Sequence, residues 1–144
     1  PAGENLPGSV THKKNLFEIV AAHDISYAAT ASVGYPQDYM NKLAKAAQVD
    51  GTSYIHIYAT CPTGWGTSTE TSISLAKEAV DCGMWYLAEY DNSEFKISRK
   101  PKKLELLKDH LLKQGRFKHL TDEDIKVIET DRDKRWERML RKWG

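Results

Sequence analysis

One stretch of fourteen residues, Ser53–Gly66 (SYIHIYATCPTGWG), constrains the fold of this chain more than any other. Its first half is rich in β-forming residues and lacks a strict alternation of polar and apolar positions. Such a run is typical of a strand buried on both faces, as in a parallel sheet. Its second half is a cysteine in a Pro/Gly turn. Ligands of open parallel sheets lie beyond the carboxyl ends of the strands, so Cys61 is predicted to lie at a ligand site.

The rest of the sequence alternates between helical and extended segments. Apolar residues at helical spacing predict helices over 13–23, 36–48, 68–82, 102–113 and 121–143. Short β-rich segments lie between the first four, at 25–31, 53–59 and 85–90, and 94–98 is expected to form a short edge strand. This order predicts an α/β fold with a mostly parallel sheet flanked by helices.

Two of these helices have clear apolar faces. The helix over 68–82 is expected to point Ile73, Ala76 and Val80 inward and to stop at Gly83. The last helix begins with a Thr121 cap, and its stripe comprises Ile125, Ile128, Trp136, Met139 or Leu140, and Trp143. The two tryptophans of this stripe are expected either to contact another chain or to dock within this one.

Cys61 is the residue with the clearest chemical role. Iron–sulfur clusters are bound by cysteine thiolates and tuned by nearby backbone amides. Gly64 and Gly66 lack a Cβ, so a large cofactor can approach their amides, and Trp65 can shield it from water. One cysteine does not hold a cluster, however, and Cys82 lies twenty-one residues further on in a predicted helix. Two alternatives therefore remain for Cys61: a cluster ligand or a small buried thiol.

Several segments, in this order, resemble the β subunit of pyruvate:ferredoxin oxidoreductase and related 2-oxoacid:ferredoxin oxidoreductases. They are 27–32 (YAATAS), 53–57 (SYIHI) running into 61–65 (CPTGW), 79–85 (AVDCGMW) and 114–120 (QGRFKHL). Residues 1–5 (PAGEN) resemble the loop after that family's thiamine-binding turn. The resemblance implies that residues 1–100 are the second half of a thiamine-diphosphate-binding α/β domain and that residues 101–144 form a helical C-terminal extension.

For function, the resemblance implies oxidative decarboxylation of a 2-oxoacid with thiamine diphosphate and Mg²⁺, and electron transfer through a [4Fe-4S] cluster to ferredoxin. Pyruvate with coenzyme A is the default, and oxalate or another 2-oxoacid is the alternative. The position of Cys61 matches a cluster ligand of the family, and Thr63, Gly64 and Trp65 would lie beside it; the catalytic residues stay unidentified. A cytoplasmic hetero-oligomer of anaerobic metabolism, with other oxidoreductase subunits, follows from the same resemblance.

The sequence also departs from the family pattern. The Gly-Asp-Gly…Asn motif for magnesium and diphosphate does not occur in it, and neither do three early cysteines. We therefore expect the upstream remainder of the β subunit to supply most thiamine contacts and the other cluster ligands. A non-catalytic iron–sulfur or assembly module is the alternative to an enzyme subunit.

Composition and charge exclude other classes. No apolar run approaches the ~20 residues of a membrane span, and no P-loop or zinc-ligand spacing occurs. Residues 96–144 hold 16 Lys/Arg and 9 Asp/Glu, against 5 and 11 in residues 1–95. Bases and acids are interleaved, which favours solvated helix faces over an acidic or phosphorylated partner. Nucleic-acid binding is not expected, because the C-terminal aromatic residues lie on a packing stripe.

Overall fold

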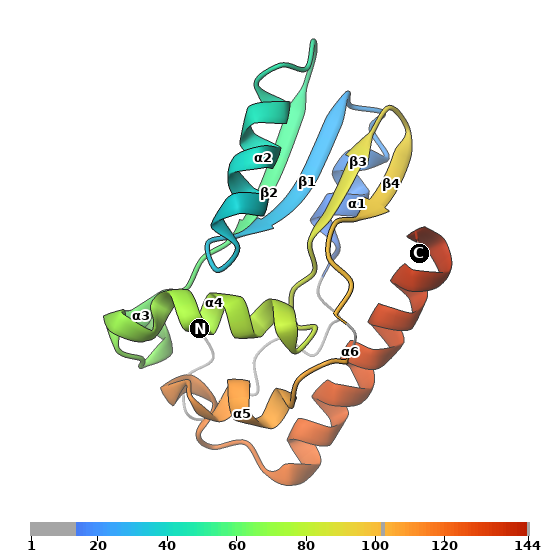
Figure 1. Cartoon of the computed structure of the whole chain (residues 1–144). Helices are drawn as coiled ribbons and strands as arrows, with labels where there is room; N and C mark the ends of the chain where they lie inside the picture. Colours follow the sequence, from blue (N-terminus) through green and yellow to red (C-terminus); the bar gives the residue numbers. More distant parts are fainter. Residues whose placement is uncertain (1–13, 102, 144) are drawn as a thin grey trace.

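The computed structural model describes residues 14–101 and 103–143, whose elements surround one four-stranded sheet (Figure 1). The strands are β1 (Tyr27–Ser32), β2 (Ser53–Tyr58), β3 (Ala88–Asp91) and β4 (Glu94–Ile97), in the spatial order β2-β1-β3-β4. The predicted α/β class is confirmed. The sheet is mixed: β1 and β2 pair in parallel, whereas β3 is antiparallel to both β1 and β4. Among the described strands, parallel pairing is confined to β1 and β2, whereas the sequence predicts a mostly parallel sheet.

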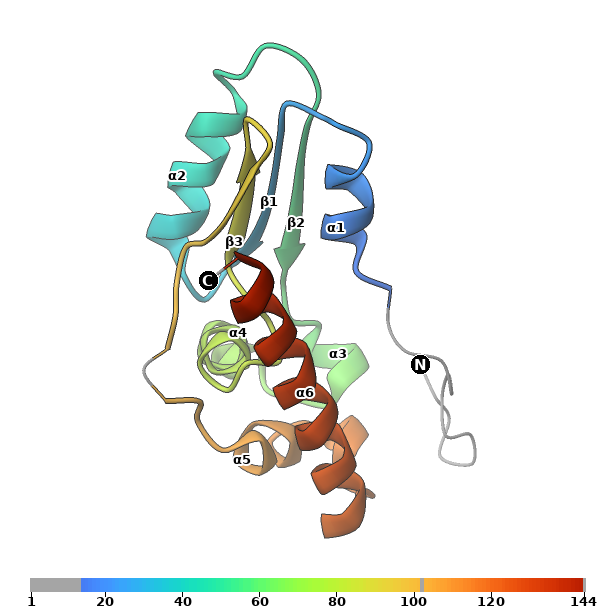
Figure 2. The same ribbon diagram turned by 90° about the vertical axis from the view of Figure 1, so that its right-hand side faces the viewer.

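Six α-helices and two short 3-10 helices are described. The α-helices are α1 (Leu16–Ala21), α2 (Pro36–Ala46), α3 (Pro62–Trp65), α4 (Ser72–Asp81), α5 (Leu107–Leu112) and α6 (Asp122–Trp143), and the 3-10 helices are η1 (Thr69–Thr71) and η2 (Gly115–Phe117). Figure 2 shows α1 and α2 on opposite sides of the sheet. The helices α3 to α5 lie beyond the end of the sheet at which β1 and β2 finish.

The strand buried on both faces is β1, not β2 as the sequence predicts. Every residue of β1 is buried, because its small Ala, Thr and Ser side chains allow helices to pack closely on both sides. The β2 strand forms one edge of the sheet among the described residues, and Ser53 and Ile57 are exposed. The long apolar run in β2 therefore does not reflect burial by the part of the chain that the structure describes.

The start of α6 and the end of α4 follow the predicted capping chemistry. At the start of α6, the Thr121 hydroxyl accepts a hydrogen bond from the Asp124 amide (3.2 Å), and the Asp124 carboxylate accepts one from the Thr121 amide (2.9 Å). This reciprocal pair satisfies two donors that the first turn would otherwise leave unpaired. Gly83 follows α4 with φ of 76°, a conformation that glycine adopts without a steric penalty.

The last helix docks within this chain. Trp143 lies against the rings of Phe17 and Phe95, and it is stacked on Phe95 with a centroid distance of 4.8 Å. Trp136 and Met139 are buried in the same core, whereas Leu140 is exposed.

The predicted inner face of α4 is partly wrong. Ala76 and Val80 are buried as predicted, but Ile73 is exposed. Leu75 and Ala79 are buried instead, because the helix turns the side of Leu75, Ala76, Ala79 and Val80 toward the core.

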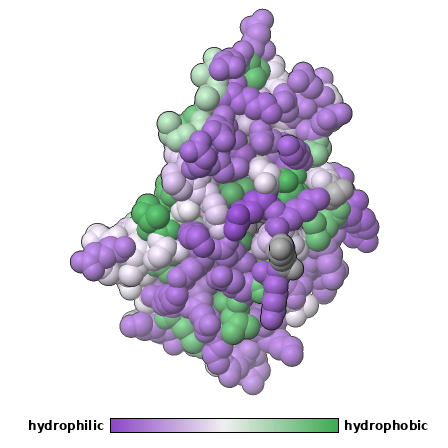
Figure 3. Space-filling model, viewed as in Figure 1, coloured by the Kyte–Doolittle hydropathy of each residue, from purple (hydrophilic) through white to green (hydrophobic). Residues whose placement is uncertain are grey.

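The face of the molecule seen in Figure 3 is mainly polar. Figure 3 shows that hydrophilic residues cover most of one face and that hydrophobic residues form small, separate patches. Among the described helices, none combines the length and the apolar content needed to cross a membrane.

Candidate functional site

Cys61 lies in the turn that follows β2, at the end of the sheet where β1 also finishes. It is exposed and precedes the one-turn helix α3, which begins with Pro62. The Trp65 amide donates a hydrogen bond to the Cys61 carbonyl (2.9 Å), which closes the turn. A Cβ added to Gly64 would lie 3.2 Å from Cys61 Sγ, so the glycine leaves the space next to the sulfur open. The structure thus rejects the alternative of a buried thiol for Cys61.

The other predicted site residues lie in the same turn. Thr63 is exposed in α3, and Trp65 is half-buried against Tyr58, with 5.9 Å between ring centroids. Gly66 ends α3 in the left-handed conformation, with φ of 64° and ψ of 47°. All four predicted residues, Cys61, Thr63, Gly64 and Trp65, are therefore brought together by one short segment.

A second turn, at Gln114–Phe117, packs directly on the cysteine turn. The Gly115 amide donates a hydrogen bond to the Gly66 carbonyl (3.3 Å). A Cβ on Gly66 would lie only 3.2 Å from the Gly115 Cα, so the two backbones approach each other at a glycine pair. The CPTGW and QGRFK motifs, about fifty residues apart in the sequence, are thus neighbours in space.

Arg116 connects the two turns. Its guanidinium carbon lies 3.9 Å from the centroid of the Trp65 ring and 4.5 Å from that of Phe117. Its Nε donates a hydrogen bond to Gln114 Oε1 (3.0 Å). Partial burial lowers the pKa of the guanidinium, and the nearby Tyr58 and Cys61 groups act in the opposite direction. The guanidinium of Arg116 therefore lies against the ring of Trp65, four residues after Cys61 in the same turn.

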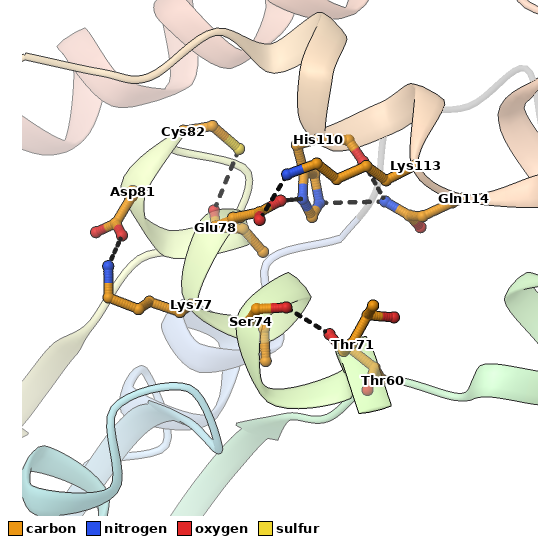
Figure 4. Close-up of polar contacts among 12 residues, drawn as sticks. Thr60, Thr71, Ser74, Lys77, Glu78, Asp81, Cys82, His110, Lys113 and Gln114 are labelled. Carbon is orange, nitrogen blue, oxygen red and sulfur yellow. Dashed lines mark hydrogen bonds and ion pairs between the residues drawn. The ribbon is translucent and has the colours of Figure 1, made fainter. Parts of the chain in front are cut away.

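Gln114, which accepts the hydrogen bond from Arg116, is in contact with the buried side chain of His110. Gln114 is fully buried, and its Nε2 donates to the His110 carbonyl (3.1 Å) and lies 3.2 Å from His110 Nε2. Figure 4 shows His110 and Lys113 converging on Glu78; the Lys113–Glu78 ion pair measures 2.7 Å. Burial lowers the pKa of His110, so its imidazole is predominantly neutral near pH 7. Glu78, His110 and Lys113 line a pocket of about 540 Å³ between α4 and α5, and Cys61 is not part of its lining.

Cys82 is not a partner for Cys61. It is 1% exposed at the end of α4, and its thiol contacts the Ala79 carbonyl at 3.7 Å. Burial raises the pKa of its thiol to about 11. A thiol that is buried and protonated is a packing group and not a metal ligand.

The residues present fit one ligand of an iron–sulfur cluster and not a complete site. Cys61 offers an accessible sulfur in a glycine-walled turn, as a ligand to a bulky centre requires. Within the described ranges, however, no three His, Cys, Asp or Glu side chains are grouped so as to hold a metal ion.

Sequence reasoning missed the roles of Gln114 and Arg116. Both belong to the QGRFK motif that helps to carry the family resemblance, but the motif alone names no contact. The available signal for a role of Arg116 was its position directly after Gly115 and before the aromatic Phe117.

Several known proteins are similar in sequence to this chain. It is 44% identical over 144 residues to ketoisovalerate oxidoreductase subunit VorB of Pyrococcus abyssi, covering 96% of this chain and 45% of the relative. It is 42% identical over 129 residues to pyruvate synthase subunit PorB of Methanocaldococcus jannaschii, covering 90% and 43%. With PorB of Thermotoga maritima the identity is 37% over 145 residues, covering 97% and 45%. No family model matches the chain.

The chain, with its α/β fold, is thus similar to proteins that are named as oxidoreductase subunits. More specifically, the predicted resemblance to β subunits of 2-oxoacid:ferredoxin oxidoreductases is confirmed, because the chain is similar to PorB and VorB subunits over nearly all of its own length. The chain spans slightly less than half the length of these relatives.

Proposed function

We propose that this chain is part of the β subunit of a thiamine-diphosphate-dependent 2-oxoacid:ferredoxin oxidoreductase, in which Cys61 supplies one thiolate to a [4Fe-4S] cluster. The observation that carries the proposal is the exposed Cys61 sulfur at the end of β2, beside Gly64, in a turn docked on the QGRFK motif. Cluster sulfurs accept hydrogen bonds from backbone amides, and a glycine-containing turn leaves such amides accessible.

Each predicted residue then has a physical task. Gly64 leaves room for the cluster, Trp65 covers it from water together with Arg116, and Thr63 lies on the exposed side of the turn. Thiamine diphosphate supplies the carbanion chemistry of decarboxylation when it is bound. We propose that it and Mg²⁺ are held mainly by parts of the subunit outside this chain.

Partners and substrate follow from the family. Relatives are named as pyruvate synthase and ketoisovalerate oxidoreductase subunits, so pyruvate with coenzyme A, or a branched-chain 2-oxoacid, is the substrate we propose; oxalate is the alternative. The other partners are ferredoxin, other oxidoreductase subunits and the upstream part of this subunit. Among the described residues β2 pairs with β1 alone, and its second edge suits a further strand of that upstream part. A thiamine-fold part over 1–100 and a helical extension over 101–144 remain our proposed domains.

The test is Cys61→Ser in the complete oxidoreductase complex, with Cys82→Ala as the matched control. We expect Cys61→Ser to remove the low-potential EPR signal of one cluster and 2-oxoacid-dependent ferredoxin reduction. Cys82→Ala should retain both, because Cys82 is buried apart from the turn. Unchanged iron content and ferredoxin reduction in Cys61→Ser would refute the proposal.

The same variant separates an enzyme subunit from a non-catalytic iron–sulfur module. If the chain is part of the enzyme, loss of the Cys61 thiolate abolishes ferredoxin reduction at saturating 2-oxoacid. If the cluster signal disappears while ferredoxin reduction persists, the chain binds iron without carrying the electrons of the reaction.

A further inference from the structure

We propose that Arg116 is a positioning residue that holds a fixed positive charge beside the Cys61 turn and thereby favours the reduced, more negative state of the cluster bound there. This inference rests on the proposed function. It goes beyond it by assigning the potential of that centre to a residue about fifty positions away in the sequence.

The guanidinium is held on three sides. It stacks on the Trp65 ring (3.9 Å) and on the Phe117 ring (4.5 Å), and its Nε is bonded to Gln114 Oε1. Gln114 is itself fully buried, and its Nε2 donates a hydrogen bond to the His110 carbonyl. Its side chain is therefore held in one position. A planar, permanently charged group fixed on aromatic faces is a role that arginine fills better than lysine.

The stack fixes the charge relative to the cysteine. Trp65 belongs to the same turn as Cys61, and its amide is bonded to the Cys61 carbonyl. The glycine contact between Gly66 and Gly115 sets the distance between the two turns. Arg116 therefore keeps its place only while the two turns remain docked, and its charge acts on whatever group the Cys61 sulfur carries.

The expected consequence is a shift in the one-electron reduction potential of the cluster. Adding an electron to the cluster makes it more negative, and a nearby cation stabilises that state relative to the oxidised one. Removal of the charge should then make the cluster harder to reduce. A tenfold change in the equilibrium constant of a one-electron couple corresponds to about 59 mV.

The first experiment is a redox titration of the complete complex, followed by EPR. Arg116→Gln should lower the reduction potential of one cluster, by up to about tenfold in the equilibrium constant, about 59 mV. Arg116→Lys should recover part of the shift, because it keeps the charge and loses the planar stack. Lys118→Gln removes an equal charge from another exposed side chain of the same segment, one that, unlike Arg116, has no described contact with the Trp65 ring, and it should leave the potential unchanged. An unshifted potential in Arg116→Gln would overturn the inference.

The second experiment needs no cluster. In the iron-free full chain carrying Cys82→Ala, the Cys61 thiol is reacted with a dianionic and with a neutral aromatic disulfide. A positive charge next to the sulfur attracts the anionic reagent, so the ratio of the two rates should fall several-fold in Arg116→Gln and not in Lys118→Gln. The difference should shrink at high salt. Circular dichroism checks that each variant is folded.

The two experiments separate the inference from the function on which it rests. An equal rate ratio in the parent chain and in Arg116→Gln overturns the inference, whatever Cys61→Ser does to the iron content. Retained iron and activity in Cys61→Ser overturn the proposed function, whatever the rate ratio shows.

Discussion

The docking of the two turns makes a sharp prediction for Gly66. In Gly66→Ala the backbone of residue 66 must keep its φ of 64°, and the new Cβ would lie 3.2 Å from the Gly115 Cα. The left-handed conformation costs a residue with a Cβ roughly 1–2 kcal/mol. Carbon atoms pack best at about 3.5–4.0 Å, so the contact adds about 1–2 kcal/mol of overpacking. We expect the free energy of unfolding to fall by about 2–4 kcal/mol.

Urea unfolding of the full chain, followed by tryptophan fluorescence, measures this change. With a slope of about 2 kcal/mol per molar urea, the midpoint should fall by about 1–2 M. Gly66→Asn separates the two contributions, since asparagine tolerates the left-handed region and retains only the contact. Thr63→Ala, an exposed change in the same turn, should stay within about 0.5 kcal/mol of the parent chain. A Gly66→Ala change below about 0.5 kcal/mol would refute the docked arrangement.

Three further predictions concern the core and the thiols. Trp143→Ala removes a ring stacked on Phe95 and should lower the free energy of unfolding by about 3–5 kcal/mol in the same urea assay; a loss below about 1 kcal/mol would contradict docking of α6. Burial lowers the pKa of His110 in the folded chain, so as the pH falls the unfolded chain takes up this proton at a higher pH than the folded chain does. The free energy of unfolding should therefore fall as the pH drops below about 6.5, by at most about 1.4 kcal/mol per pH unit. His110→Gln should flatten this part of a stability–pH curve, and an identical slope would contradict the neutral, buried imidazole. Iodoacetamide at pH 8 should label Cys61 alone in the folded chain, because burial raises the pKa of Cys82 to about 11; equal labelling of both thiols, by mass spectrometry, would be contrary evidence.

Local signals predicted most of the elements. Helical spacing and caps located α2, α4 and α6, since Pro36, Gly83 and Thr121 act through their own backbone conformation or hydrogen bonds. The cysteine turn was also predictable, because Pro62 and Gly66 fix a short turn after a β-rich run. These features depend on neighbours within a few residues, which a single sequence contains.

Long-range features were not predictable in the same way. The apolar run of β2 indicates a buried strand, yet it lies at the sheet edge, because burial depends on which segments pair with it. The antiparallel direction of β3 depends on the path of the chain through α4 and not on its own residues. The contact of Arg116 with Trp65 arises from the docking of two turns distant in sequence.

The most direct measurement is an anaerobic crystal structure of the complete complex, with diffraction data collected on both sides of the iron absorption edge. We expect an anomalous iron peak bonded to Cys61 Sγ, with the Arg116 guanidinium still stacked on Trp65 beside it. A Cys61 sulfur with no iron within bonding distance, in a complex whose other clusters are intact, would show that Cys61 is not a cluster ligand.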